Sequence, residues 1–150
     1  MMKQSYQIRI ESLGAKMFKH ITTTLILLPV LAYWLILSPV IPNKNIHKGY
    51  YTYSYDGKWK IAVYNVSPTT PISFVQYLQE KRYIVLYNKN DEYIGQSTPF
   101  CYQSLFDYNV MFPESDLDDL LFLPKECDYS IPAVNPRWWS KIIKYRLSLL

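Results

Sequence analysis

The chain has 150 residues, 49% of them hydrophobic and 17% aromatic, and a formal net charge of +4. Four bases and one acid lie in residues 1–20, whereas the sequence from residue 44 onwards carries 12 bases and 11 acids. This near balance argues against a nucleic-acid-binding domain, which would be basic in its folded part. The four glycines are too scattered to form a glycine-rich phosphate loop, so no nucleotide cofactor is predicted.

Residues 21–43 contain no acidic or basic side chain. About 20 apolar residues suffice for a helix to cross the ~30 Å hydrocarbon layer of a bilayer. We predict a cytoplasmic tail over residues 1–20, a transmembrane signal anchor over 21–42 and an exported domain over 43–150. Proline cannot continue a helix, so Pro39 and Pro42 are expected to end the span.

Two other interpretations of the apolar segment stay open. It could be a helix buried in a core, although a domain this small has little interior for a helix that is apolar all round. It could also be a signal peptide cleaved after Val30-Leu31-Ala32. Cleavage there would leave the apolar stretch "YWLILSPVIP" exposed, so we favour a retained anchor.

The orientation of the span is not settled by the positive residues, because both flanks carry four of them. Cys101 and Cys127 are the two cysteines of the chain, and both follow the apolar segment. An even pair in a small exported domain predicts a disulfide; two free thiols in a cytosolic domain are the alternative. Their spacing is not that of a zinc site, so no metal is predicted.

Residues 49–67, "GYYTYSYDGKWKIAVYNVS", have the composition of a β-hairpin. Aromatic and β-branched residues predict strands over 50–55 and 58–66. Asp56-Gly57 between them predicts a type I′ turn, in which both central residues have positive φ. Alternation along the second strand places Ile61 and Val63 on one face.

The stretch "TTPISFVQYLQEKR" predicts a helix over 71–81. Thr70 suits the N-cap and Pro71 suits the first helical position. Ile72, Val75 and Leu78 recur at helical spacing, which predicts an apolar face.

A second hairpin is predicted over residues 83–96, with strands at 83–87 and 92–96 around a polar turn at 88–91. A further strand is predicted at 108–112. Together with the helices, these elements predict an α+β domain built on an antiparallel sheet.

The segment 113–123, "PESDLDDLLFL", is predicted to be a short helix with acids at its positive end. The acids could also form a contact surface for a basic protein partner, and we predict that role for Glu114, Asp116, Asp118 and Asp119. A third possibility is a carboxylate-dependent envelope hydrolase, whose cleft would hold at least two of Asp107, Glu114, Asp116 and Asp128. His20 and His47 flank the span, so neither histidine is expected inside the folded domain.

The C-terminal segment 137–150 is predicted to be a basic amphipathic helix. Such a helix, rich in tryptophan, can lie in a membrane interface; alternatively, Trp138, Ile142 and Leu149 close the domain core. Aromatic residues also collect where spans meet water. The predicted membrane-interface residues are therefore Tyr33, Trp34, Trp138, Trp139, Lys141 and Lys144.

The stretches "LSPV", "SPTTPISFVQYL" and "YNKNDEYIGQSTPFCYQSLF", with the tyrosine-rich hairpin, resemble small single-span envelope proteins of enterobacteria. The resemblance covers residues 30 to 110 and includes no catalytic motif. Some proteins of this build look like immunity partners of secreted toxins. The resemblance implies a non-enzymatic protein in the bacterial inner membrane, with its C-terminal domain in the periplasm.

We therefore expect a protein-binding module held at the membrane, without cofactor or nucleic acid, with toxin immunity as its sharpest form. An accessory subunit of an envelope complex, in which the span itself packs against other spans, is one alternative. The carboxylate-dependent hydrolase is the other.

Overall fold

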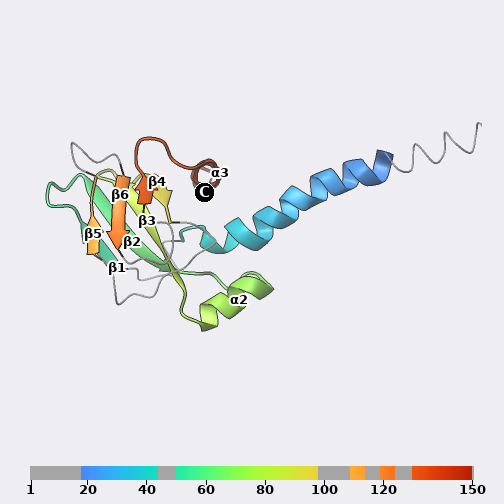
Figure 1. Cartoon of the computed structure of the whole chain (residues 1–150), viewed down its shortest axis with the longest axis horizontal. Helices are drawn as coiled ribbons and strands as arrows, with labels where there is room; N and C mark the ends of the chain where they lie inside the picture. The colour runs from blue at the N-terminus through green and yellow to red at the C-terminus, as the bar shows by residue number, and fades with distance from the viewer. Residues whose placement is uncertain (1–17, 44–49, 98–108, 114–118, 124–129, 150) are drawn as a thin grey trace, which may run out of the picture. The chain divides into compact units, whose positions relative to one another are not determined.

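The computed structural model describes residues 18–43, 50–97, 109–113, 119–123 and 130–149, and of residues 50, 109–110 and 119–123 the backbone alone. The chain forms two compact units, Met1–Trp34 and Leu35–Leu150. Figure 1 follows the chain from the N-terminal helix to the C-terminal helix α3.

The apolar segment forms one helix, Phe18–Val40, which is long and apolar enough to span a membrane. It continues through Pro29, and residues 18–31 are exposed; Leu25 is 69% exposed. The buried core helix is therefore wrong for this segment. The hydroxyls of Thr22, Thr23 and Thr24 donate to carbonyls four residues earlier, so these polar groups are satisfied within the helix.

The second unit begins at Leu35, within the last turns of this helix. These turns consist of the π-helical turn η1 (Tyr33–Leu37) and the 3₁₀ turn η2 (Ser38–Val40). Leu37 and Val40 are buried. Ile41, which precedes Pro42, is extended, as expected of a residue before proline. Residues 35–40 of the helix are therefore part of the second unit, in which Leu37 and Val40 are buried.

Sheet A contains four antiparallel strands in the order β1 (Tyr50–Tyr53), β2 (Trp59–Asn65), β3 (Arg82–Asn88) and β4 (Tyr93–Gln96). The central pair sets the register, with Ile61 opposite Leu86 and Val63 opposite Ile84. Both predicted hairpins are confirmed, and with them the α+β class.

The turn between β1 and β2 differs from the predicted type. Gly57 has a φ of 67°, but Asp56 is not among the residues with positive φ. The Gly57 N–H donates to the Ser54 carbonyl at 3.0 Å, so a type I turn followed by a left-handed glycine closes the hairpin. Asp56 instead accepts from the Ser54 hydroxyl and the Lys58 N–H, which fixes the loop without positive φ.

Sheet B contains β5 (Asn109–Met111), β6 (Asp119–Leu123) and β7 (Ser130–Pro132), all antiparallel. The strand predicted at 108–112 is confirmed, whereas the helix predicted at 113–123 is wrong over its second half. A short apolar run such as "LLFL" suits a strand or a helix equally. Pairing on both sides, with β5 and β7, decides for the strand. β7 has no counterpart in the sequence prediction.

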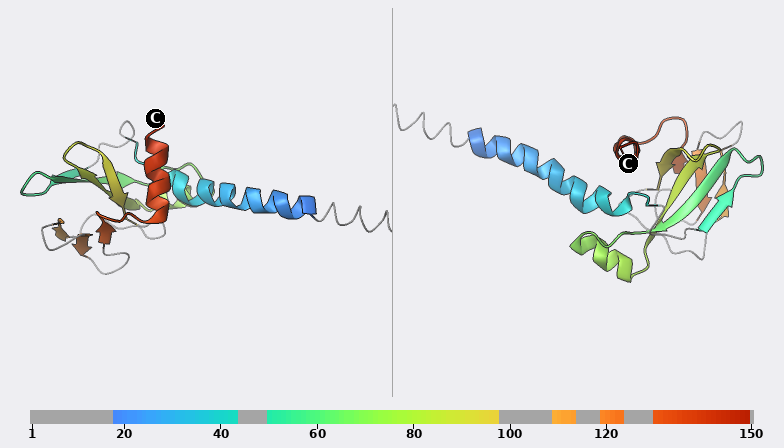
Figure 2. Two further views of the ribbon diagram at one scale, coloured as in Figure 1. Left: turned by 90° about the horizontal axis from the view of Figure 1, so that it is seen from above. Right: turned by 180° about the vertical axis from the view of Figure 1, so that it is seen from behind.

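The core lies between the two sheets, which form separate layers in Figure 2. Ile61, Val63, Ile84 and Leu86 of sheet A pack with Ile131 of β7. The layers approach most closely at Gly95, where an added Cβ atom would lie 2.9 Å from Cγ2 of Ile131. Glycine at this position therefore lets β4 contact β7.

Helix α2 (Pro71–Leu78) follows β2, and Thr70 caps it as predicted. Thr70 and Ser73 form a reciprocal capping box, and Glu80, with a φ of 54°, ends the helix three residues earlier than predicted. Ser73 is the buried residue of α2, so the predicted apolar face does not face the core.

Helix α3 (Trp138–Leu147) confirms the C-terminal helix and contacts β4. Its buried residues are Trp139, Ser140 and Ile143. Trp138 and Leu149 are 71% and 59% exposed. The alternative in which Trp138, Ile142 and Leu149 close the core is therefore wrong.

We expect Gly95→Ala to lower the free energy of unfolding by about 1–3 kcal/mol, the usual cost of overpacking. Ile131 is 1% exposed and branched at Cβ, so its methyl group has little room to move. Urea unfolding in detergent measures the change. Tyr55→Ala, at a fully exposed hairpin residue, is the control and should change stability by less than about 0.5 kcal/mol. Equal midpoints for both variants would contradict this packing.

The Ser54 hydroxyl, followed by the Lys58 N–H and ammonium, lowers the pKa of the Asp56 carboxyl from 3.8 to about 2. A lowered folded-state pKa stabilises the hairpin fully above the unfolded value, and this contribution disappears as the pH falls through about 2. A carbon-detected NMR titration should show that midpoint. Ser54→Ala should move it upward, and an unchanged midpoint in that variant would refute the assigned cause.

Candidate functional site

The end of the apolar helix is hydrogen-bonded to sheet A and to the segment that follows β2. The Ser67 N–H donates to the Pro39 carbonyl at 2.9 Å, and the Gln96 side-chain amide donates to the Val40 carbonyl at 3.1 Å. Val40 and Val66 have no exposed surface. Carbonyls near a helix end lack partners within the helix, and here sheet A and its flanking loop supply them.

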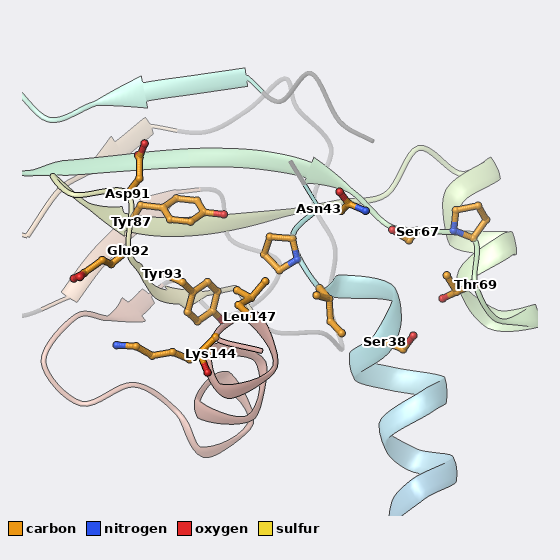
Figure 3. A pocket seen from close by; sticks show the side chains of 14 residues that line it. Ser38, Asn43, Ser67, Thr69, Tyr87, Asp91, Glu92, Tyr93, Lys144 and Leu147 are labelled. Carbon is orange, nitrogen blue, oxygen red and sulfur yellow. The ribbon is translucent and has the colours of Figure 1, made fainter. Parts of the chain in front are cut away.

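A groove of about 1040 Å³ lies beside this joint. Four segments that are far apart in sequence line it, and Figure 3 shows their side chains around it. They are the helix end at residues 38–43, the loop 67–69, the β3–β4 turn and the last turn of α3. Ser38 in the last turn of the apolar helix and residues 41–43 directly after the helix thus form one wall.

The β3–β4 turn carries two acids of the groove, Asp91 and Glu92. Asp91 forms an ion pair with Lys60. Glu92 accepts from the Asn88 amide at 2.6 Å, and Asn88 accepts in turn from the Glu92 N–H. Both carboxylates are therefore engaged in holding the turn, in which Asp91 has a φ of 61°.

The Lys60 ammonium also lies over two tyrosine rings. It is 5.3 Å from the ring centroid of Tyr51 and 5.2 Å from that of Tyr87. Its side chain is 14% exposed, and partly desolvated cation–π contacts are stronger than exposed ones. Lys60 consequently links β2, β1 and the groove-lining end of β3.

Tyr87 and Tyr93 give the groove its aromatic lining. The Tyr87 hydroxyl lies 3.0 Å from that of Tyr64, and the Tyr93 hydroxyl lies 2.8 Å from that of Ser140. Burial, the largest cause in each case, raises the pKa of Tyr87 and of Tyr93 well above the usual range. Both phenols therefore stay neutral at physiological pH and act as hydrogen-bonding groups.

The C-terminal side of the groove comes from Lys144, Leu147 and Ser148 of α3. Lys144 is exposed, and it faces the groove together with the apolar Leu147. The groove thus brings together a lysine, the two acids of the β3–β4 turn and an aromatic and aliphatic lining. This arrangement suits an amphipathic ligand.

The structure separates the predicted interface residues. Trp138, Lys141 and Lys144 are exposed, whereas Trp139 is 5% exposed and packs inward. Trp34 is 44% exposed near the end of the first unit, and Tyr33 is half-buried. On α3, therefore, Trp138, Lys141 and Lys144 are accessible to a membrane interface, whereas Trp139 is not.

The remaining predicted site residues cannot be placed. Asp119 begins β6, and its side chain is not described. The predicted disulfide, the other acids of the predicted contact surface and the remaining hydrolase candidates lie outside the described residues: Cys101, Cys127, Glu114, Asp116, Asp118, Asp107 and Asp128. Within the described ranges, no three metal-ligating side chains come together.

The sequence predictions did not identify the groove. Its walls meet through contacts between positions such as 39 and 67, which local periodicity does not report. Two of its walls did have a local signal in the sequence. Prolines end the apolar helix, and the polar stretch "NKNDE" predicts the turn between β3 and β4.

The chain matches the Family of unknown function (DUF6201) over residues 19–143. It belongs to this family. The matched range contains the apolar helix, both sheets and part of α3, so helix and domain together form the DUF6201 unit. No curated protein and no solved structure matches the chain.

In this DUF6201 protein we expect Tyr64→Phe and Tyr87→Phe to cost about 1–3 kcal/mol each, because each removes the hydrogen bond between these two buried hydroxyls. Tyr64 is 1% and Tyr87 is 4% exposed. The double variant should cost clearly less than the sum of the single variants. Chemical unfolding of the four proteins measures this cycle, and strict additivity would show that the two hydroxyls do not interact.

Proposed function

We propose that this protein is a single-span membrane protein whose domain binds another protein through the groove. The observation that carries the proposal is that the end of the apolar helix forms one wall of that groove. A partner that enters it contacts residues 38–43, directly at the end of the span. The protein would therefore select partners that come close to the membrane surface.

The lining favours a polypeptide ligand. Small-molecule pockets usually measure about 300–1,000 Å³ and enclose their ligand, whereas this groove lies at the upper limit and draws its walls from four separate segments. Its lining combines tyrosines with charged side chains, and protein interfaces likewise combine aromatic residues with polar ones. Both acids of the turn are already bonded, which speaks against their use as a catalytic pair.

We further propose that the span lies in a bacterial inner membrane and that the domain lies in the periplasm, where Cys101 and Cys127 would form a disulfide. A phosphatase reporter fused after Leu150 should then be active, and a cytoplasmic reporter at the same site should be inactive. The reverse pattern would overturn the topology. A secreted toxin is the partner class implied by the resemblance to envelope proteins.

The accessory-subunit alternative makes a different demand on the helix. It needs the native surface of the span, whereas groove binding needs only the joint. Because the second unit begins at Leu35, the span should be exchanged over residues 18–34 alone. A protein that keeps its partner after this exchange supports groove binding; loss of the partner with an intact domain supports the subunit.

A photo-cross-linking residue at Leu147, in the groove, should capture a defined partner in intact cells. Tyr145 lies on the same helix, is 67% exposed and does not line the groove, so the same probe there is the matched control. Lys144→Glu should reduce capture at Leu147 several-fold, because edge charges steer association. Equal capture at both positions would exclude the groove as the binding surface.

A further inference from the structure

Helix α2 presents apolar side chains to solvent. Phe74 and Val75 are each 52% exposed, as is Ile72, and Leu78 is 65% exposed. At 100° per residue these four side chains span an arc of roughly 160°. Figure 2 shows α2 standing clear of both sheets. An exposed apolar helix of this kind marks an interaction surface.

The ends of α2 are satisfied within the chain. Ser73 N–H donates to the Thr70 hydroxyl, and the Thr70 N–H donates to the Ser73 hydroxyl. At the other end the N–H groups of residues 79–81 donate to carbonyls of α2. A helix that enters an apolar medium must satisfy its backbone internally, and α2 does so at both ends.

The short segment between Ser67 and α2 limits how far α2 can lie from the end of the apolar helix. The Ser67 N–H bonds to Pro39, in the last turn of the apolar helix. Only Pro68, Thr69 and Thr70 separate Ser67 from α2, a reach of roughly 10–14 Å. If the apolar helix spans the bilayer, α2 therefore lies within reach of the membrane surface.

The surrounding sequence is free of charge. No acidic or basic residue occurs from Ile61 to Gln79, and Glu80, Lys81 and Arg82 follow, with a net charge of +1. Charged groups strongly oppose entry into the acyl region, whereas basic residues at its edge attract anionic headgroups. This distribution fits a helix lying at the boundary between headgroups and acyl chains.

We propose that α2 is a second membrane contact, which lies in the interface of the bilayer that the apolar helix spans and inserts Phe74 and Leu78. The inference rests on the membrane-spanning part of the proposed function and not on the groove. A protein occupant is less suited: an eight-residue helix is about 12 Å long, too short to bury by itself the roughly 1,000 Å² that a stable interface needs.

The test places benzoylphenylalanine at one position at a time in the full chain, reconstituted in vesicles of phosphatidylethanolamine and phosphatidylglycerol. Phe74 is the test position. Leu28, 64% exposed on the apolar helix, reports the span. Tyr55 is fully exposed at the far end of β2, which is roughly 23 Å long, and serves as the matched control. Unchanged melting in detergent verifies that each labelled protein is folded.

After irradiation, mass spectrometry should find lipid adducts at Leu28 and Phe74, with a yield at Phe74 roughly tenfold above that at Tyr55 for a helix lying in the interface. Adducts at Leu28 without adducts at Phe74 would overturn the inference and leave the span intact. A cross-link from Phe74 to a second copy would also overturn it. The absence of lipid adducts at both positions would contradict both the membrane span and the second membrane contact.

Discussion

Val40 lies in the last turn of the apolar helix, yet it has no exposed surface and its carbonyl accepts from Gln96 of sheet A. One residue earlier, the Pro39 carbonyl accepts from Ser67. These two bonds join the end of the helix to sheet A and to the segment beyond β2. Separating the helix end from the domain would break both bonds and expose the Val40 side chain to water, which is unfavourable for an apolar group.

The groove and the position of α2 both depend on this joint. Residues 38–43 form a wall of the groove because they are packed against the domain. Helix α2 starts close to the end of the apolar helix because Ser67 is bonded to it. Without these two bonds, residues 38–43 would not form a fixed wall of the groove, and the segment that precedes α2 would not be tied to the helix end.

The sequence predicted the elements whose signal is local. Both hairpins of sheet A followed from β-branched alternation and turn residues, and α2 followed from Thr70 and Pro71. The sequence predictions failed where contacts between distant residues determine the structure. The run "LLFL" becomes a strand because β5 and β7 flank it. Trp138 and Trp139 are neighbours on α3, and only the contact of Ser140 with Tyr93 explains which of them turns inward.

Contacts between residues far apart in the sequence also explain why the candidate site was not predicted. Tyr87, Asp91 and Lys144 have no common motif, since the fold brings them together from β3, a turn and α3. The apolar arc of α2 was visible in the sequence, but periodicity cannot state whether such an arc meets a core, a partner or a membrane. Its exposure of about half or more at each apolar residue shows that the arc does not meet the core.

The joint between helix and domain can be tested with two valines of the same helix. Val40 is fully buried, whereas Val30 is 61% exposed. Hydrogen exchange of the β2 and β3 amides in lipid nanodiscs measures the stability of the domain. Val40→Ala should lower the opening free energy by about 1.5–3 kcal/mol, and Val30→Ala should leave it unchanged. Equal exchange in the two variants would show that the helix end is only a linker and would contradict the account.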